Sequence, residues 1–132
     1  MTPRSPLETL KSYFAIESTR DIQGVLDHFS PDAAFLSPGG TRHGRGEIRG
    51  YYEESARDYP GLLVRFGAGF EDGTHAALEW QATLTDPRGV SHPLAGTNVV
   101  EVRDGLFVSF RTYFDPAALA TTVPPSHPSP EH

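Results

Sequence analysis

The stretch from residue 75 to residue 115 constrains the fold most strongly, because it reads as three consecutive β-strands. Its apolar runs, HAALEWQATLT, HPLAGTNVVEVR and LFVSFRTYFD, are joined by the turn sequences DPRG at residues 86–89 and RDG at residues 103–105. An Asp-Gly pair between two apolar runs is a strong signal for a β-hairpin. The sequence therefore predicts an antiparallel meander in this part of the chain.

Polar and apolar side chains alternate along the first of these strands, as they do when the two faces of a strand meet different surroundings. One face carries the mainly polar set His75, Ala77, Glu79, Gln81 and Thr83, and the other carries Ala76, Leu78, Trp80, Ala82 and Leu84. The apolar face of an antiparallel sheet needs a partner, and the N-terminal half of the chain has helices of suitable period. The predicted fold class is therefore α+β, with a curved sheet.

Three helices and two further strands are predicted ahead of the meander. The first helix begins at the capping sequence SPLE at residues 5–8, the second follows Asp21, and the third spans about residues 45–58. Short strands are predicted at residues 33–37 and 62–70. The predicted order is helix, helix, strand, helix and then four strands.

The chain has the length of one domain with a buried core, at 132 residues. After Asp115 the apolar pattern stops, and residues 121–132 are rich in proline and serine, with little apolar surface to bury. We therefore expect a single domain in residues 1–120 and a proline-rich mobile tail in residues 121–132.

Composition and charge exclude several classes of partner. A net charge of −6 and the lack of a Lys/Arg-rich run offer no basic surface to a nucleic acid or an anionic membrane. The chain has no cysteine, and no two of its six histidines have the i, i+4 spacing of a metal-binding pair on a helix. No leader or membrane-spanning run is visible. We expect a cytoplasmic protein that uses no metal or other cofactor.

Several short motifs together resemble the SnoaL-like branch of the nuclear transport factor 2-like superfamily over residues 7–115. They are YF at 13–14, FSPDA at 29–33, GRGEI at 44–48, EW at 79–80, EVRDG at 101–105 and YFD at 113–115. The resemblance implies a cone in which a curved antiparallel sheet wraps around three N-terminal helices. This superfamily includes ketosteroid isomerases, polyketide cyclases, limonene epoxide hydrolases, dehydratases and non-enzymatic binders, so the fold does not select a reaction.

The catalytic residues implied by these enzyme classes are replaced in this chain. The resemblance to ketosteroid isomerases implies an aspartate base at the position of Ser37 and a protonated aspartate donor at that of Asn98. Limonene epoxide hydrolases would have an arginine and two aspartates at Glu79, Gln81 and Thr112. SnoaL-type aldol cyclases would have an acidic residue at Thr112 and a histidine at Asn98. None of these mechanisms can be carried over unchanged.

Glu79 is the predicted catalytic acid or base. If the polar face of its strand lines the cone, Glu79 is the only carboxylate from the sheet in the cavity, and burial among aromatic rings would raise its pKa. The alternative is a structural ion pair or hydrogen-bond network, for example with Arg65 on the neighbouring strand.

Tyr13, Tyr52 and Asn98 are candidate hydrogen-bond donors to a substrate carbonyl or enolate. The alternative for the tyrosines is a core position with hydroxyls bonded to the backbone. Catalysis is thus assigned to Glu79, Tyr13 and Asn98. The residues predicted to bind substrate are Phe14, Ser37, Tyr52, Phe66, Gln81, Phe110, Thr112 and Phe114.

These expectations describe a cofactor-independent acid/base enzyme of isomerase, lyase or cyclase type. Its substrate would be a small, mainly apolar metabolite, carbonyl-bearing or polycyclic, held in the cone cavity. The alternative is a non-catalytic module that binds a hydrophobic small molecule or serves for dimerisation. A homodimer is predicted through an apolar row taken to lie on the outer face of the sheet, because a row with tryptophan is too apolar to remain in water. That row is Leu78, Trp80, Ala82 and Leu84.

Overall fold

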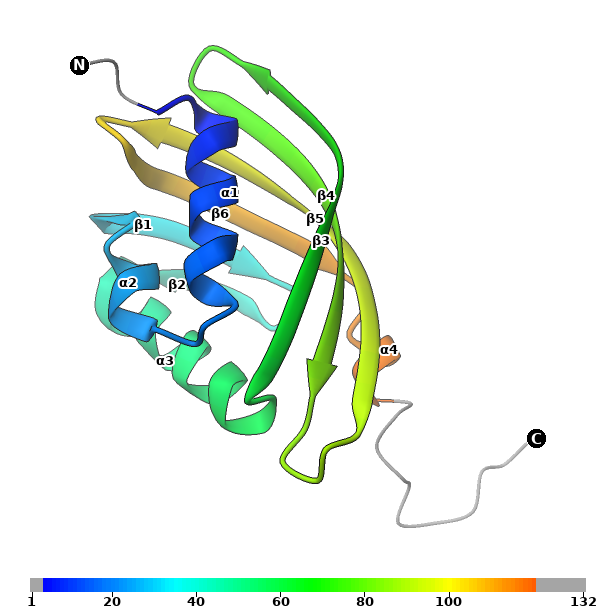
Figure 1. Cartoon of the computed structure of the whole chain (residues 1–132). Helices are drawn as coiled ribbons and strands as arrows, with labels where there is room; N and C mark the ends of the chain where they lie inside the picture. Colours follow the sequence, from blue (N-terminus) through cyan, green and yellow to red (C-terminus); the bar gives the residue numbers. More distant parts are fainter. Residues whose placement is uncertain (1–3, 121–132) are drawn as a thin grey trace.

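The computed structural model describes residues 4–120, and Figure 1 shows a sheet that curves around helix α1. This arrangement confirms the predicted α+β cone. The proline-rich tail predicted for residues 121–132 lies outside the described residues. No helix within the described part is long and apolar enough to span a membrane. The elements follow in the order α1 (Pro6–Glu17), α2 (Ile22–Leu26), β1 (Phe29–Ser37), β2 (Gly40–His43), α3 (Gly44–Asp58), β3 (Gly61–Asp72), β4 (His75–Thr85), β5 (Ser91–Arg103), β6 (Leu106–Phe114) and α4 (Ala117–Ala120).

Local sequence determines where the first two helices begin. At α1, Glu8 N donates to Ser5 Oγ at 3.1 Å and Ser5 N donates to Glu8 Oε1 at 2.8 Å, which forms the predicted capping box. At α2, Asp21 Oδ1 accepts a hydrogen bond from Gly24 N at 3.0 Å. Both predicted helix starts are confirmed, and the loop between them contributes to the site described below.

The strands form one sheet in the order β2-β1-β6-β5-β4-β3. Strands β3 to β6 make the antiparallel meander, with turns at residues 86–89 and 103–105 as predicted. Strand β1 pairs parallel with β6, and β2 pairs antiparallel with β1. Strand β2 was not predicted, because its four residues GTRH show no apolar alternation and remain mostly exposed.

The two faces of β4 are the reverse of those assumed for the pocket. Glu79 and Gln81 are exposed on the convex face, so their predicted position inside the cavity is wrong. The apolar row packs on the concave side, where α1 contacts the sheet, because each large apolar side chain removed from water contributes about 2 kcal/mol. The predicted use of this row as an outer dimer surface is therefore also wrong. The buried row is Ala76, Leu78, Trp80, Ala82 and Leu84.

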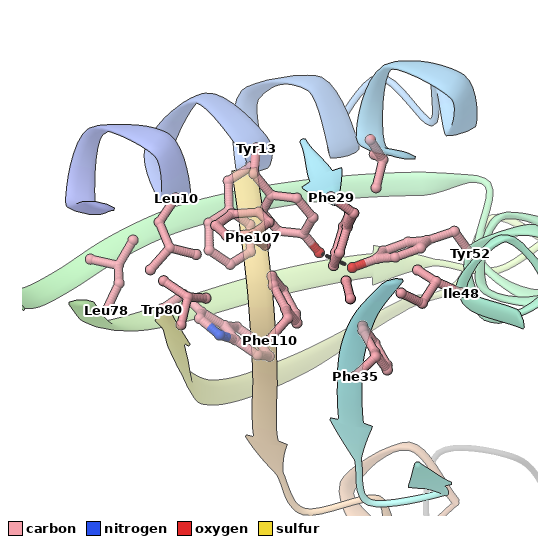
Figure 2. Close-up of a cluster of buried hydrophobic side chains, with 14 of the residues drawn as sticks. Leu10, Tyr13, Phe29, Phe35, Ile48, Tyr52, Leu78, Trp80, Phe107 and Phe110 are labelled. Carbon is pink, nitrogen blue, oxygen red and sulfur yellow. Dashed lines mark hydrogen bonds between the residues drawn. The ribbon is translucent and has the colours of Figure 1, made fainter. Parts of the chain in front are cut away.

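An aromatic cluster fills the cone between α1 and the sheet (Figure 2). The Tyr13 ring on α1 meets Phe110 and Phe107 of β6 edge to face, with centroids 5.0 and 5.7 Å away. Phe110 in turn stacks on Phe35 of β1 at 5.3 Å. Because these rings surround Tyr13 closely, its hydroxyl is held in one place at the wall of the cavity.

Candidate functional site

A cavity of about 200 Å³ lies between α1, α3 and the concave face of the meander. Its wall is mainly apolar with a few polar groups, which is the usual composition of a small-molecule site. The aromatic lining residues are Tyr13, Phe14, Tyr51, Tyr52, Tyr59, Trp80, Phe110 and Phe114. The aliphatic ones are Leu62, Val64, Ala82, Leu84, Leu94 and Leu119, and the polar ones are Glu17, Arg20, Glu54, Ser55, Asp58, Asn98 and Thr112.

Glu17, the last residue of α1, places a buried carboxyl in this cavity. Burial raises the pKa of Glu17 to about 7, although the Arg20 guanidinium acts in the opposite direction. Oε2 accepts a hydrogen bond from Arg20, whereas Oε1 has no hydrogen-bond partner within residues 4–120. Glu17 can therefore take up or release a proton near neutral pH, and one of its oxygens remains available to a ligand.

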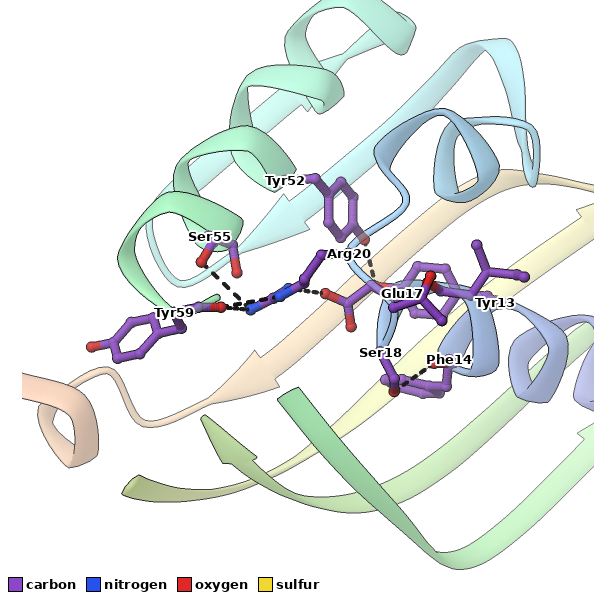
Figure 3. Close-up of polar contacts among 10 residues, drawn as sticks. Tyr13, Phe14, Glu17, Ser18, Arg20, Tyr52, Ser55 and Tyr59 are labelled. Atoms are coloured by element: carbon purple, nitrogen blue, oxygen red, sulfur yellow. Dashed lines mark hydrogen bonds and ion pairs between the residues drawn. The ribbon is translucent and has the colours of Figure 1, made fainter. Parts of the chain in front are cut away.

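Arg20 holds Glu17 in place from the loop that follows α1 (Figure 3). Its Nη1 donates to Glu17 Oε2 at 2.6 Å, and its Nε and Nη2 donate to the main-chain oxygen of Tyr59 at 3.1 and 2.6 Å. Arg20 has a φ of 61°, in the left-handed region that costs a non-glycine residue about 1 kcal/mol or more. This strained residue ties the end of α1 to the end of α3 and positions the Glu17 carboxyl.

Tyr13 and Tyr52 form a buried pair in the cavity wall, with hydroxyl oxygens 2.6 Å apart (Figure 2). Burial is the main cause that raises the pKa of both phenols well above the usual value, so both stay protonated at neutral pH. One hydroxyl donates to the other, and the second O–H hydrogen has no acceptor among the described residues. The hydroxyls thus pair with each other rather than with the backbone, and one hydrogen is available to a ligand.

Asn98 supplies a second donor from β5, where it pairs in register with Thr112 of β6. Its Oδ1 accepts a hydrogen bond from Trp80 Nε1 at 3.0 Å. No atom within residues 4–120 accepts a hydrogen bond from its Nδ2. The cavity therefore contains a titratable carboxyl and two kinds of neutral donor, which is a set suited to proton transfer next to a carbonyl group.

The structure brings most of the predicted site residues to this cavity. Those that line it are Tyr13, Phe14, Tyr52, Asn98, Phe110, Thr112 and Phe114. Glu79 does not line the cavity. Within the described residues it forms no ion pair with Arg65, whose Nη2 donates instead to Gln81 Oε1 at 3.1 Å. The pairing suggested between Glu79 and Arg65 is therefore wrong, as is the placement of Glu79 as a cavity base.

Ser37 and Phe66 also lie outside the cavity lining, so their predicted positions are wrong. Ser37 is buried at the end of β1, where its Oγ accepts a hydrogen bond from Gly39 N at 3.3 Å. The Phe66 ring is 45% exposed and packs beside Phe14, with the Lys11 ammonium 5.8 Å from its centroid. Ser37 stabilises a turn, and Phe66 covers the edge of the core.

Glu17 and Arg20 are the site residues that sequence reasoning missed. A signal for Glu17 was present, because it follows Leu10, Tyr13 and Phe14 at helical spacings of seven, four and three residues. A carboxyl in such an apolar stripe faces the core unless the helix ends first. No comparable signal pointed to Arg20. Among residues 4–120, no three His, Asp or Glu side chains come together as a candidate metal site.

Known proteins share this architecture. TerC, co-crystallised with polyporic acid, is 22% identical, with a TM-score of 0.78 and coverage of 88% of this chain and 95% of that one. An NTF2-like protein of unknown function from Burkholderia pseudomallei is 21% identical, with a TM-score of 0.81 and coverage of 91% and 98%. A protein with a ketosteroid isomerase-like fold from Catenulispora acidiphila, in complex with trimethylamine, is 17% identical, with a TM-score of 0.80 and coverage of 96% and 100%.

These structural likenesses establish the fold alone. No curated protein matches the chain. The sequence model of the SnoaL-like domain, however, matches residues 10–110, which include most of α1, all of α3 and the sheet as far as the middle of β6. The chain therefore belongs to the SnoaL-like domain family, with the fold of the NTF2-like protein described above.

Proposed function

We propose that this protein is a cofactor-independent acid/base enzyme, of isomerase, lyase or cyclase type, that acts on a small carbonyl compound in the cone cavity. The observation that carries the proposal is the Glu17 carboxyl, which is buried in an aromatic cavity with a pKa of about 7 and one unpaired oxygen. A general acid or base works best when its pKa lies near the operating pH. Glu17 thus takes the role predicted for Glu79.

In the proposed reaction, ionised Glu17 removes a proton from the carbon next to the substrate carbonyl. The electron pair of the broken C–H bond moves into the carbonyl and gives an enolate. The Asn98 amide and the free hydroxyl hydrogen of the Tyr13–Tyr52 pair donate to the enolate oxygen, which positioned neutral donors stabilise strongly. If a carbon–carbon double bond is conjugated with the enolate, protonated Glu17 returns the proton to the far carbon of that system, which gives an isomer. If the enolate instead expels a leaving group from the β carbon, the leaving group takes the proton from Glu17, which is lyase chemistry. If the enolate carbon attacks a second carbonyl carbon of the same substrate, the new alkoxide takes the proton, which is cyclase chemistry.

The size of the cavity favours a small substrate over a polycyclic one. An apolar cavity of about 150 Å³ accommodates benzene, and this cavity measures about 200 Å³. A single ring with a carbonyl group therefore fits, whereas a compound of three or four fused rings would extend beyond the mouth. We propose a single-ring carbonyl compound as the substrate.

The test of this proposal is exchange of hydrogen for deuterium next to the carbonyl of cyclohexanone in deuterium oxide, followed by proton NMR. Exchange requires only the first step, removal and return of the proton, so it does not depend on knowing the natural reaction. The proposal predicts exchange that saturates with ketone concentration. Saturable binding without any enzyme-dependent exchange would instead support the alternative, a non-catalytic small-molecule-binding module.

We also propose a homodimer through the convex face of the sheet. Arg65 pairs in register with Gln81, two residues from Glu79, so a cation and an anion lie close together on this face. Neither charge forms an ion pair within residues 4–120. A two-fold axis nearby would set Arg65 of one copy against Glu79 of the other. The exposed side chains of Leu63 and Tyr113 add apolar surface on the same face.

Charge reversal tests this dimer. Arg65→Glu and Glu79→Arg should each raise the dimer dissociation constant by about tenfold or more, because like charges would then meet across the axis. The double variant should recover wild-type association, since the opposite charges are restored. Light scattering provides the measurement. A wild-type particle with the 14.4 kDa mass of one chain at micromolar concentration would contradict the dimer, and a dimer insensitive to both reversals would place the interface elsewhere.

A further inference from the structure

The hydrogen bond between Trp80 and Asn98 determines which end of the Asn98 amide is available in the cavity. An indole N–H can only donate, so the atom 3.0 Å from Trp80 Nε1 must be the amide oxygen. The orientation of this amide therefore follows from chemistry. The remaining polar atom of the side chain is Nδ2, which can only donate and has no acceptor within residues 4–120.

Gly96 makes this arrangement possible. It lies opposite Trp80 in the β4–β5 register, and the indole lies across it. A Cβ at position 96 would be 2.8 Å from Cη2 of Trp80 and closer still to Cζ2. Any side chain at this position would displace the indole, and with it the N–H that holds the Asn98 oxygen.

The apolar surroundings of Asn98 increase the energetic cost of leaving its Nδ2 without a hydrogen-bond acceptor. Asn98 is 1% exposed, and its neighbours on the concave face include Leu78, Val100 and Phe110. A ligand without an acceptor atom would bury Nδ2 with no hydrogen bond, which weakens binding by roughly tenfold or more. A ligand with a carbonyl oxygen at this point avoids that loss.

We propose that Trp80 and Gly96 are positioning residues that fix Asn98 as a hydrogen-bond donor and so select ligands with an acceptor oxygen on a single ring. This inference rests on the proposed function only in that it concerns the same cavity. It names the feature by which that cavity recognises its substrate, and it assigns no role to Glu17.

The test uses two ligands of matched shape, cyclohexanone and methylenecyclohexane, of which only the first has an acceptor oxygen. The quantity measured is the ratio of their dissociation constants, obtained by ligand-observed NMR. General damage to the cavity would weaken the binding of both ligands alike, so it would leave this ratio unchanged. Trp80→Phe keeps an aromatic ring but removes the N–H, and Asn98→Leu removes the amide. Each variant should shift the ratio by about tenfold against the ketone.

Phe114→Leu is the matched control. Phe114 lines the cavity beside Trp80, with ring centroids 6.3 Å apart, but it offers no polar group. This variant should change both dissociation constants by the same factor and leave the ratio unchanged. A wild-type ratio in Trp80→Phe would overturn the positioning role, and an equal shift of the ratio in Phe114→Leu would do the same, because the effect would then lack chemical specificity.

A measurement on the wild-type protein covers the case in which a variant does not fold. Trp80 is the only tryptophan of the chain, so its indole N–H gives one unambiguous NMR signal. Saturation with cyclohexanone should move the Asn98 side-chain amide protons downfield, while the indole N–H stays protected from solvent exchange. Amide protons that do not respond to the ketone would overturn the inference.

A decalone, with two fused rings, tests the size limit in the same assay. It should bind more weakly than cyclohexanone, and tighter binding would overturn the single-ring restriction. Because all these measurements concern binding, they separate this inference from the proposed reaction. Ketone selectivity without deuterium exchange would refute the enzyme and leave the recognition intact, whereas exchange without selectivity would refute the recognition alone.

Discussion

Replacing Glu17 with glutamine should slow deuterium exchange into cyclohexanone by about a hundredfold or more, which is the usual effect of losing a positioned acid or base. The amide keeps the shape of the side chain and can still accept a hydrogen bond from Arg20, so the cavity should remain intact. Cyclohexanone binding should therefore change little while exchange is lost. Glu53→Gln is the control, because Glu53 is an exposed carboxylate on α3 outside the cavity lining, and this variant should exchange at the wild-type rate.

The pH dependence of the deuterium-exchange rate is a second test of Glu17 as the base. Proton removal requires ionised Glu17, so the rate should rise with pH and level off above about 7, where burial places the pKa of this carboxyl. The residual rate of Glu17→Gln should lack this inflection. An unchanged profile in the variant would show that another group is the base.

Glu17→Gln should also stabilise the folded protein at mildly alkaline pH, by about 3 kcal/mol. The pKa of Glu17 is raised from 4.5 to about 7 on folding, mainly by burial. The folded state therefore binds this proton more tightly than the unfolded state does. The resulting stability is fully present below pH 4.5 and is lost as pH rises through about 7. Glutamine is neutral throughout and avoids the loss.

Urea unfolding of both proteins across this pH range provides the measurement. The difference in free energy of unfolding should be small near the unfolded pKa of 4.5 and grow until pH passes about 7. Arg20 does not reverse this result, because its attraction is already included in the pKa of Glu17 and its bonds to the Tyr59 oxygen persist. A variant less stable than wild type at alkaline pH would mean that Glu17 is a structural ion-pair partner.

Apart from β2 and the short α4, the strands and helices could be predicted from the sequence because their signals are local. The capping box at residues 5–8, the Asp21 cap and the two turns of the meander are each encoded within a few adjacent residues. The sequence also predicted Tyr13, Tyr52 and Asn98 in one cavity, which required the resemblance to a known family as well as strand parity.

The alternation of polar and apolar residues along β4 could not decide which face of this strand points into the cone. The pattern shows that the row containing Trp80 must be buried, and both the helices and a second copy of the chain could bury it. In the folded chain the helices do so, since α1 contacts β3, β4 and β5 directly. The polar row with Glu79 then has to face outward, which removes it from the cavity.

The chemistry of Glu17 could not be predicted because it depends on distant residues. Its pKa rises only when β-strands from the second half of the chain enclose the end of α1. Arg20 reaches Glu17 because the Arg20 backbone is left-handed, and the sequence STR at positions 18–20 gives no indication of this conformation. The only local indication of the role of Glu17 was that this charged residue continues the apolar stripe of α1.

The most direct measurement of the central claim is an NMR titration of the Glu17 side-chain carboxyl carbon in the wild-type protein, with its signal assigned by its loss in Glu17→Gln. A buried carboxyl poised for proton transfer should titrate at about pH 7. Saturation with cyclohexanone should perturb the same signal, because the ligand would lie against Oε1. Titration near the ordinary value of 4.5, with no response to ligand, would contradict the assignment of Glu17 as the acid/base group of this cavity.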